Sequence, residues 1–319
     1  MNRAIAILFG LTVVVVVLSL LGGTEWISPF SLSDADLSAV LFKFRLPRVL
    51  LVFVIGAVLA VIGSVYQAIL NNSLADPYIL GTSSASAIGV VIAGVLLFPI
   101  DSLGARACGL LAAGLLTALL LGMANRQRGG VTDRLILFGF AGNLVLSSLL
   151  FVILSVHSQA LGAGSMRWLF GRIPWVGLSE AISLSLLLVV LAIPLFAKAT
   201  AFNAISLGDG VCRSLGFDPK RTRAVALVFS SILIAVIVAV AGSIGFVGLI
   251  IPHLAREVLA SSLGRRALLI QFWMGGLFLV AADLVSRTIH PPLEIPIGTI
   301  TNLFGGPLFL YLMWRRPVG

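Results

Sequence analysis

Charged residues are scarce in this chain. Only 10% of its 319 residues are Asp, Glu, Lys or Arg, whereas 59% are hydrophobic, and the mean hydropathy is +1.14. An ordinary soluble domain carries about 25% charged residues, so this composition excludes that class. Because about 20 apolar residues cross a bilayer, the length predicts an all-α, polytopic membrane protein with roughly ten spans. The whole chain, residues 1–319, then forms a single transmembrane domain.

Side chains and motifs that carry chemistry are also sparse. The two cysteines, Cys108 and Cys212, lack metal-type spacing and predict no disulfide, and the three histidines are too scattered to predict a metal site. The patterns HExxH, GxSxG and GxxxxGK[ST] are absent, which leaves a zinc protease, an elbow-type serine hydrolase and a P-loop ATPase without support. We therefore expect no catalytic residue, no cofactor in this chain and no ATP hydrolysis by it.

Basic residues outnumber acidic ones and give a formal net charge of +9. They lie between apolar runs instead of clustering, so nucleic acid is not an expected partner. If the N-terminus is cytoplasmic, about two thirds of the 21 Lys and Arg residues fall in inner loops. The bias predicts that both termini are cytoplasmic and that the chain crosses the membrane an even number of times.

Apolar runs separated by polar segments predict ten spans. The eighth run is too short to cross alone and is expected to be a half-length or tilted helix. In the second, Gly56, Ala60 and Ser64 recur every four residues, which predicts close approach of another helix. The predicted spans are 4–23, 48–70, 80–99, 106–124, 134–157, 178–197, 224–242, 251–263, 267–289 and 296–314.

Ionisable groups are almost absent from these spans. Asp283 is the main exception, and Arg287 follows it by four residues on the same helix face, so the two are expected to pair near the outer end. A structural ion pair and an ion-coupling role both fit this pattern. An ion-coupled secondary transporter therefore stays as the alternative function.

One long polar stretch, residues 198–223, interrupts the apolar pattern. Its Asp, Asn, Gly and Pro residues would break a span but suit one or two short helices joined by turns. A cytoplasmic platform of this kind is where a soluble partner would dock. A plain solvated connector is the alternative.

Short motifs follow one another in a fixed order from about residue 45 to the end of the chain. They are Arg45-Leu46-Pro47-Arg48, Gly56-Ala57, Gly63, Gln67, the run from Asn72 to Gly81, Leu207-Gly208-Asp209, Leu215-Gly216, Gly242, Phe246-Val247-Gly248-Leu249, Pro252-His253, Arg256, Glu294, Pro296, Gly298 and Gly306-Pro307. This ordered set resembles that of FecCD-type ABC importer permeases, and the set is specific although each motif alone is weak. Two positions depart from the family pattern, Ser73 in place of Pro and Cys212 in place of Ala.

The resemblance implies a type II importer permease with ten helices in the cytoplasmic membrane of a prokaryote. Its implied partners are membrane lipid, a second permease that is an identical copy or a paralogue, two cytoplasmic ATPase subunits that use ATP and Mg²⁺, and an external, periplasmic substrate-binding protein. The implied cargo is a metal chelate, with ferric siderophore ranked first and haem or cobalamin as alternatives. The residues alone do not separate these cargoes from an oxyanion.

Site residues follow from the same resemblance. It implies ATPase coupling by a short helix in the loop 198–223, at Leu207, Gly208, Asp209, Leu215 and Gly216. It implies docking of the binding protein at Arg45, Arg48 and Arg287, where guanidinium groups suit pairing with carboxylates and anchoring of helix ends is the alternative.

Two further groups of residues complete the predicted sites. A cytoplasmic gate is implied at Asn72, Leu74, Thr132 and Asp133, with ordinary turn chemistry as the alternative. The pathway near the outer mouth is expected to include Arg167, Trp168 and Arg172, which equally suit anchoring at the membrane surface.

Overall fold

The chain folds into a bundle of helices, seen here in a computed structural model. The structure describes residues 2–23, 39–96, 98–99, 102–125, 131–157, 164–258 and 264–315, and no strand occurs among them. Each of the ten predicted spans overlaps one long helix. These helices are α1 (Asn2–Leu21), α3 (Leu46–Ile69), α4 (Thr82–Leu96), α5 (Leu103–Asn125), α6 (Val131–Val156), α9 (Leu178–Ala197), α12 (Pro219–Ala241), α13 (Val247–Val258), α14 (Arg265–Thr288) and α15 (Ile297–Arg315).

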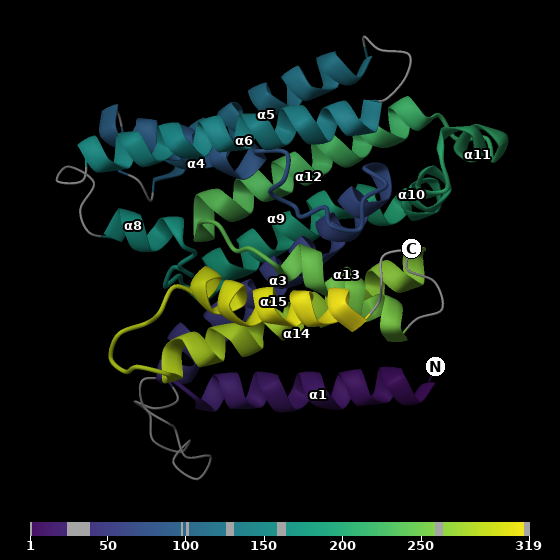
Figure 1. Cartoon of the computed structure of the whole chain (residues 1–319). Helices are drawn as coiled ribbons and strands as arrows, with labels where there is room; N and C mark the ends of the chain where they lie inside the picture. Colours follow the sequence, from purple (N-terminus) through teal and green to yellow (C-terminus); the bar gives the residue numbers. More distant parts are fainter. Residues whose placement is uncertain are drawn as a thin grey trace.

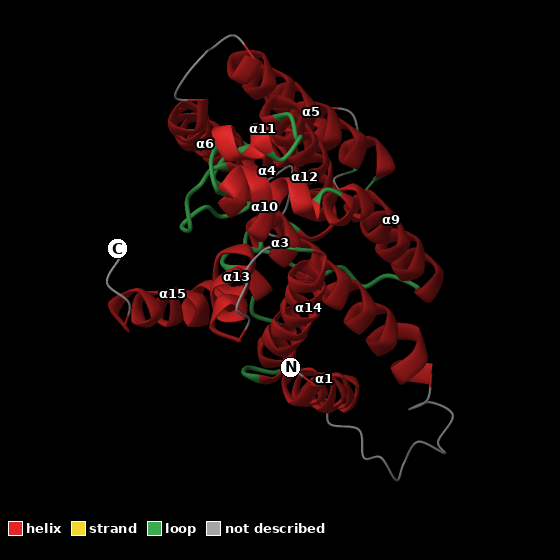
Figure 2. Ribbon diagram, turned by 90° about the vertical axis from the view of Figure 1, so that its right-hand side faces the viewer, coloured by secondary structure: helices red, strands yellow, loops and turns green. Residues whose placement is uncertain are grey.

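Helix α3 forms the centre of the bundle, and α9, α13 and α14 pack around it (Figure 2). It continues without a break from a π-helical turn, η2 (Leu41–Arg45), and Pro47, which has no backbone N–H to donate, lies directly after this wider turn. Nearly all of its side chains are buried because α3 is apolar on every face. Helices α5, α6 and α15 instead expose many large apolar side chains, as helices in contact with lipid or with another apolar surface do.

Small residues let α3 approach its neighbours closely, as the spacing of Gly56, Ala60 and Ser64 predicts. A Cβ atom added to Gly56 would lie 2.4 Å from the carbonyl oxygen of Gly275 on α14, and the Ser64 hydroxyl donates a hydrogen bond to Gln271 on the same helix. The predicted close helix contact is confirmed, and α14 is the helix that makes it.

Four of the ten helices are not among the six that are long and apolar enough to cross a membrane in the part of the chain that the structure describes. The apolar parts of α1, α4 and α15 are shorter, and α13 has 12 residues, which confirms the half-length eighth helix. The predicted span at 80–99 corresponds to α4, which has 15 residues and follows turns at residues 70–81. Its crossing, like the total of ten crossings, stays a prediction.

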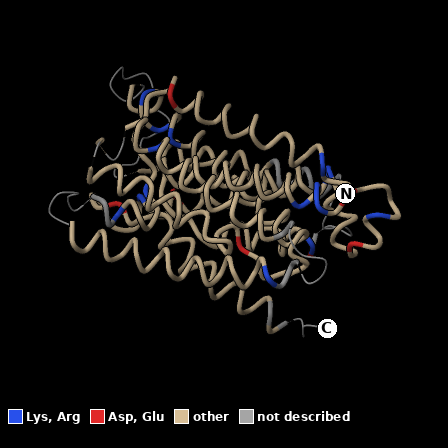
Figure 3. The backbone as a smooth tube through the Cα atoms, turned by 90° about the horizontal axis from the view of Figure 1, so that it is seen from above, with Lys and Arg blue, Asp and Glu red and all other residues tan. Residues whose placement is uncertain are grey.

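The two ends of the bundle differ in what they carry. Two short helices, α10 (Ala199–Ser206) and α11 (Asp209–Ser214), lie at the end where α1 begins and α15 finishes (Figure 1). The short helix α8 (Gly164–Leu169) lies at the opposite end. Lys and Arg residues gather toward both ends, with long uncharged stretches between them (Figure 3). Both termini and the polar loop therefore share one side, as predicted, although three of the predicted inner arginines, Arg126, Arg128 and Arg316, lie outside the described residues.

Candidate functional site

The loop 198–223 forms two short helices, as expected from its turn residues. Phe202 and Ile205 of α10 are buried, and α10 packs against α3, α12 and α14. Helix α11 packs against α10 and α12, and its buried Cys212 faces inward. The loop is therefore a platform fixed to the bundle and not a plain solvated connector.

The platform exposes three large apolar side chains among polar ones. Leu207 and Leu215 are 65% and 58% exposed, and Val211 between them is also exposed. Exposed apolar side chains are stabilised when another apolar surface covers them, so these residues suit contact with an apolar cleft on another protein. Leu207, Val211 and Leu215 are called the coupling face below.

Two glycines shape the turns that carry the coupling face. Gly208 and Gly216 have φ angles of +106° and +82°, a left-handed region that other residues enter only with strain. Empty space surrounds the position of an added Cβ atom at both. Their backbone conformation, and not a close neighbour, therefore requires glycine.

Asp209 ties α11 to α12 through Arg223. Its carboxylate accepts hydrogen bonds from both terminal nitrogens of Arg223, at 2.6 and 3.1 Å. These hydrogen bonds lower the pKa of Asp209 below its ordinary value. All five predicted coupling residues thus lie in one platform, where Asp209 holds the position and Leu207 and Leu215 present a surface.

The opposite end of the bundle holds a network of buried charges. Arg48 on α3 donates to Asp283 on α14 at 2.9 and 3.1 Å, and to Glu294 in the α14–α15 connection at 2.9 and 3.1 Å. Its guanidinium also lies 4.6 Å from the centre of the Trp175 ring. Asp283 pairs in addition with Arg287 at 2.9 Å, which confirms the predicted i,i+4 ion pair.

Two arginines of this region hold the end of α1. Arg287 donates to the carbonyl of Gly22 and to Ser19, and Arg45 donates to the carbonyls of Leu20 and Leu21. The last carbonyls of a helix have no partner within the helix and carry a partial negative charge, so cations bind there favourably. Arg45 and Arg287 thus fasten α1 to α3 and α14.

The three predicted docking arginines are consequently buried. Arg45, Arg48 and Arg287 are 6%, 3% and 2% exposed. This placement favours the alternative, anchoring of helix ends, because every guanidinium already has partners inside the chain. Direct pairing with a binding protein stays a prediction, and it requires at least one internal contact to open.

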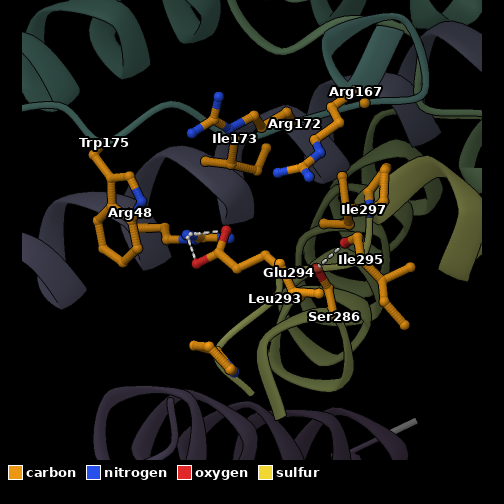
Figure 4. Close-up of a pocket in the computed structure, with 13 residues that line it drawn as sticks. Arg48, Arg167, Arg172, Ile173, Trp175, Ser286, Leu293, Glu294, Ile295 and Ile297 are labelled. Atoms are coloured by element: carbon orange, nitrogen blue, oxygen red, sulfur yellow. Dashed lines mark hydrogen bonds and ion pairs between the residues drawn. The ribbon is translucent and has the colours of Figure 1, made fainter. Parts of the chain in front are cut away.

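A cavity of about 240 Å³ borders the buried network (Figure 4). Arg48 and Glu294 form one wall, and Arg167 and Arg172 form the other. The structure therefore brings Arg167 and Arg172 together at a cavity on the end away from the coupling face. Trp168 does not join them, since its buried side chain lines a second cavity.

The predicted gate residues divide into two groups. Asn72 and Leu74 lie in the turns between α3 and α4, where the Asn72 side chain accepts a hydrogen bond from the Leu74 backbone at 2.8 Å. This contact is the turn chemistry weighed as the alternative. Thr132 and Asp133 were expected in a connection, but the structure places them in the first turn of α6, and their side chains lie outside the described residues.

The sequence did not predict that Glu294 and Trp175 contact Arg48. Glu294 stands in one of the matching motifs, and Trp175 ends the stretch 166–175 that was expected near the outer mouth, but their contacts with Arg48 join distant parts of the chain.

The described residues thus form an all-helical bundle with several helices apolar and long enough to cross a membrane and with a platform of two short helices at one end. The FecCD transport family matches residues 11–315, nearly the whole chain. The chain belongs to this family.

Relatives of this chain are named as permeases of import or transport systems. The vitamin B12 import system permease protein BtuC of Vibrio cholerae is 36% identical and aligns with 99% of this chain and 95% of its own. A probable iron chelatin permease of Helicobacter pylori is 34% identical, with 88% and 84% covered, and the hemin permease HmuU of Yersinia pestis is 34% identical, with 86% and 83% covered. A solved metal-chelate type ABC transporter in an inward-facing conformation superposes with a TM-score of 0.83 at 29% identity, and the match covers 98% of this chain and 99% of that one.

Proposed function

We propose that this chain is the membrane-spanning permease of an ATP-driven importer that moves a metal chelate through the cytoplasmic membrane of a prokaryote. The single observation that carries the proposal is the coupling face, an exposed apolar surface on a rigid platform in a chain of the FecCD family. Relatives are named for vitamin B12, haem and iron chelates, and a metal chelate is what these cargoes share.

The platform transmits force because it is fixed on its inner side. Phe202 is fully buried, and Asp209 and Arg223 connect α11 to the long helix α12. A cytoplasmic ATPase that clamps Leu207 and Leu215 would move the platform and α12 as one body when it closes on ATP and Mg²⁺. Hydrolysis then belongs to the two ATPase partners, and this chain supplies the path.

Alternating access completes the cycle. A second permease, identical or a paralogue, forms the pathway with this chain, and a periplasmic binding protein delivers cargo at the end that carries Arg167 and Arg172. The turn at Asn72 and Leu74 lies at the end of α3 and is the proposed inner constriction, together with Thr132 and Asp133. Closure of the ATPases changes the relative free energies of the inward-open and outward-open conformations of the permease.

The decisive experiment is uptake by proteoliposomes that contain the permease, its ATPases and its binding protein. We expect accumulation of chelate that requires ATP. Gly208→Glu should uncouple hydrolysis from uptake, because a side chain at φ +106° strains the turn and adds charge to the coupling face.

A matched control is Ser183→Ala on α9, whose exposed hydroxyl donates only to the Ser179 carbonyl of the same helix. Uptake by the permease alone, driven by a sodium or proton gradient and indifferent to ATP, would establish the secondary transporter instead.

The outer face needs a test that spares the buried arginines. Arg167→Glu with Arg172→Glu changes two exposed side chains at the cavity of Figure 4 without removing a partner of Asp283. We expect weaker capture of the permease complex by immobilised binding protein. Unchanged capture would assign both arginines to membrane anchoring.

A further inference from the structure

A second cavity, of about 310 Å³, lies where α4, α6, α8 and α12 meet the start of α15. Its wall combines hydroxyl and amide groups with aromatic rings. The members that matter here are Ser83, Ser84, Ser147, Trp168, Phe170 and Asn302.

Interrupted helices surround this cavity. Helix α4 begins at Thr82 after a run of turns, and α13 begins at Val247 after the non-helical segment 242–246, partway along the bundle (Figure 1). Non-helical backbone at membrane depth persists only where protein buries it or where it lines a cavity. In transporters, such breaks mark substrate sites near the middle of the membrane.

The segment 242–246 is also held in a strained conformation. Phe246 has a φ of +68°, which a bulky residue rarely adopts, and Gly245 beside it lines the cavity. A Cβ atom added to Gly245 would lie 2.8 Å from Oδ1 of Asn302. Strain of this kind persists where the surrounding structure fixes it, and it clusters at ligand sites.

Polar groups in the cavity lack protein partners. Ser83 is 6% exposed, and among the described residues its hydroxyl makes no hydrogen bond. The Asn302 carboxamide likewise has none in that part of the chain, and its exposed side chain is accessible to a ligand. A ligand that offers a hydrogen-bonding group to the largely buried Ser83 hydroxyl would give this hydroxyl the partner that it lacks.

The hydroxyls of Ser84 and Ser147 give the cavity wall a hydrogen-bond acceptor for a ligand. Ser84 donates to Oδ1 of Asn143 at 2.7 Å and lies 3.0 Å from the Ser147 hydroxyl. Because a serine hydroxyl has one hydrogen, Ser147 donates to Ser84 and keeps its own lone pairs free to accept.

The lining of this cavity carries no ionisable side chain. The cavity beside Arg48 has three arginines and one glutamate, so the two cavities select different chemistry. A carboxylate entering the second cavity would lose its hydration without meeting a cation, which is unfavourable. A carboxamide both donates and accepts, as Ser83 and Asn302 do.

We propose that the second cavity is a subsite for a neutral, hydrogen-bonding arm of the transported chelate, a carboxamide, with Ser83 and Asn302 as its partners. The inference rests on the proposed function and specifies its cargo. The cavity, about 310 Å³, is at the lower limit of pockets that enclose a drug-sized ligand, so it holds one arm of a larger chelate. Trp168, which is buried, shields the arm from water on one side and strengthens its hydrogen bonds.

Three labelled chelates test the proposal in the proteoliposomes described above. Cyanocobalamin carries carboxamide arms, ferrichrome carries the amide groups of its peptide ring, and hemin carries carboxylates and no amide. We expect uptake of cyanocobalamin or ferrichrome. Ser83→Ala combined with Asn302→Leu should raise the half-saturating concentration of that chelate roughly tenfold, the effect of losing one to two hydrogen bonds.

The variants are compared with Ser183→Ala, which removes the same hydroxyl from an exposed position on α9 and should leave uptake unchanged. Elution of the double variant as the same complex shows that it folds. An independent variant, Gly245→Ala, narrows the cavity beside Asn302 and should impair the same chelate.

Each outcome decides one question. Transport of hemin alone would overturn the neutral class of ligand. Transport of an amide-bearing chelate that the double variant and Gly245→Ala leave unchanged would overturn the site while preserving the importer. A wild-type complex that moves none of the three chelates would contradict the proposed function itself.

Discussion

The two ends of the bundle place charge and apolar surface in opposite ways. At one end, Arg48 and Arg287 are almost fully buried, each beside a carboxylate. At the other, Leu207 and Leu215 are largely exposed. A buried arginine with internal partners has little left to offer another protein, whereas an exposed leucine gains stability from being covered. The exposed leucines at one end are thus consistent with the proposed contact to a partner, whereas the buried arginines at the other end hold α1, α3 and α14 together.

The largest effect should come from removing the shared carboxylate of the buried network. Asp283→Ala leaves two guanidinium groups buried with reduced compensation, which destabilises a fold by about 3–5 kcal/mol. We expect a steep loss of folded protein in detergent, measured by thermal unfolding. Glu180→Gln is the control, because the Arg106–Glu180 pair is longer, 3.4 Å, and more exposed. Equal unfolding temperatures for the two variants would show that the network does not stabilise the bundle.

The coupling end should respond in function and not in stability. Leu215→Asp places a charge on the coupling face, and because Leu215 is exposed the chain should unfold at the wild-type temperature. ATP-dependent uptake should be lost, whereas Leu215→Met keeps the surface apolar and should retain most of it. Normal uptake by Leu215→Asp would remove this side chain from the ATPase interface.

A smaller change should come from Glu294. Glu294→Gln leaves Arg48 paired with Asp283, and Glu294 is itself partly exposed, so we expect a loss of roughly 1 kcal/mol of stability. Capture by the binding protein should rise, because one internal partner of Arg48 is weakened. Weaker capture would indicate that Glu294 itself contributes to docking.

The smallest effect concerns pH at the coupling platform. Arg223 lowers the pKa of Asp209, so the unfolded chain binds a proton there more readily than the folded one. The stabilisation is present above the ordinary carboxyl pKa and disappears as pH falls through the lowered value. Wild type should therefore exceed Asp209→Asn in unfolding temperature at pH 7, and the difference should vanish in acid. A difference that persists at low pH would mean that ionisation of Asp209 does not contribute.

The features of the fold that depend on composition and on residue spacing could be predicted from the sequence. Apolar runs located the long helices, Gly56 and its neighbours predicted a close helix contact, and the four-residue spacing of Asp283 and Arg287 predicted their pair. Each of these follows from interactions within one helix or from the preference of a segment for lipid.

Tertiary structure alone decided which of these residues face outward. The docking prediction at Arg45, Arg48 and Arg287 could not anticipate their burial, because their partners, the end of α1, Asp283 and Glu294, come from distant parts of the chain. The second cavity is likewise invisible in the sequence, since Ser83 and Asn302 meet only when α4 and α15 pack in the bundle. The sequence of each helix determines whether it is more stable in lipid or in water. The packing of the helices determines which polar groups form hydrogen bonds within the chain and which remain available to a ligand.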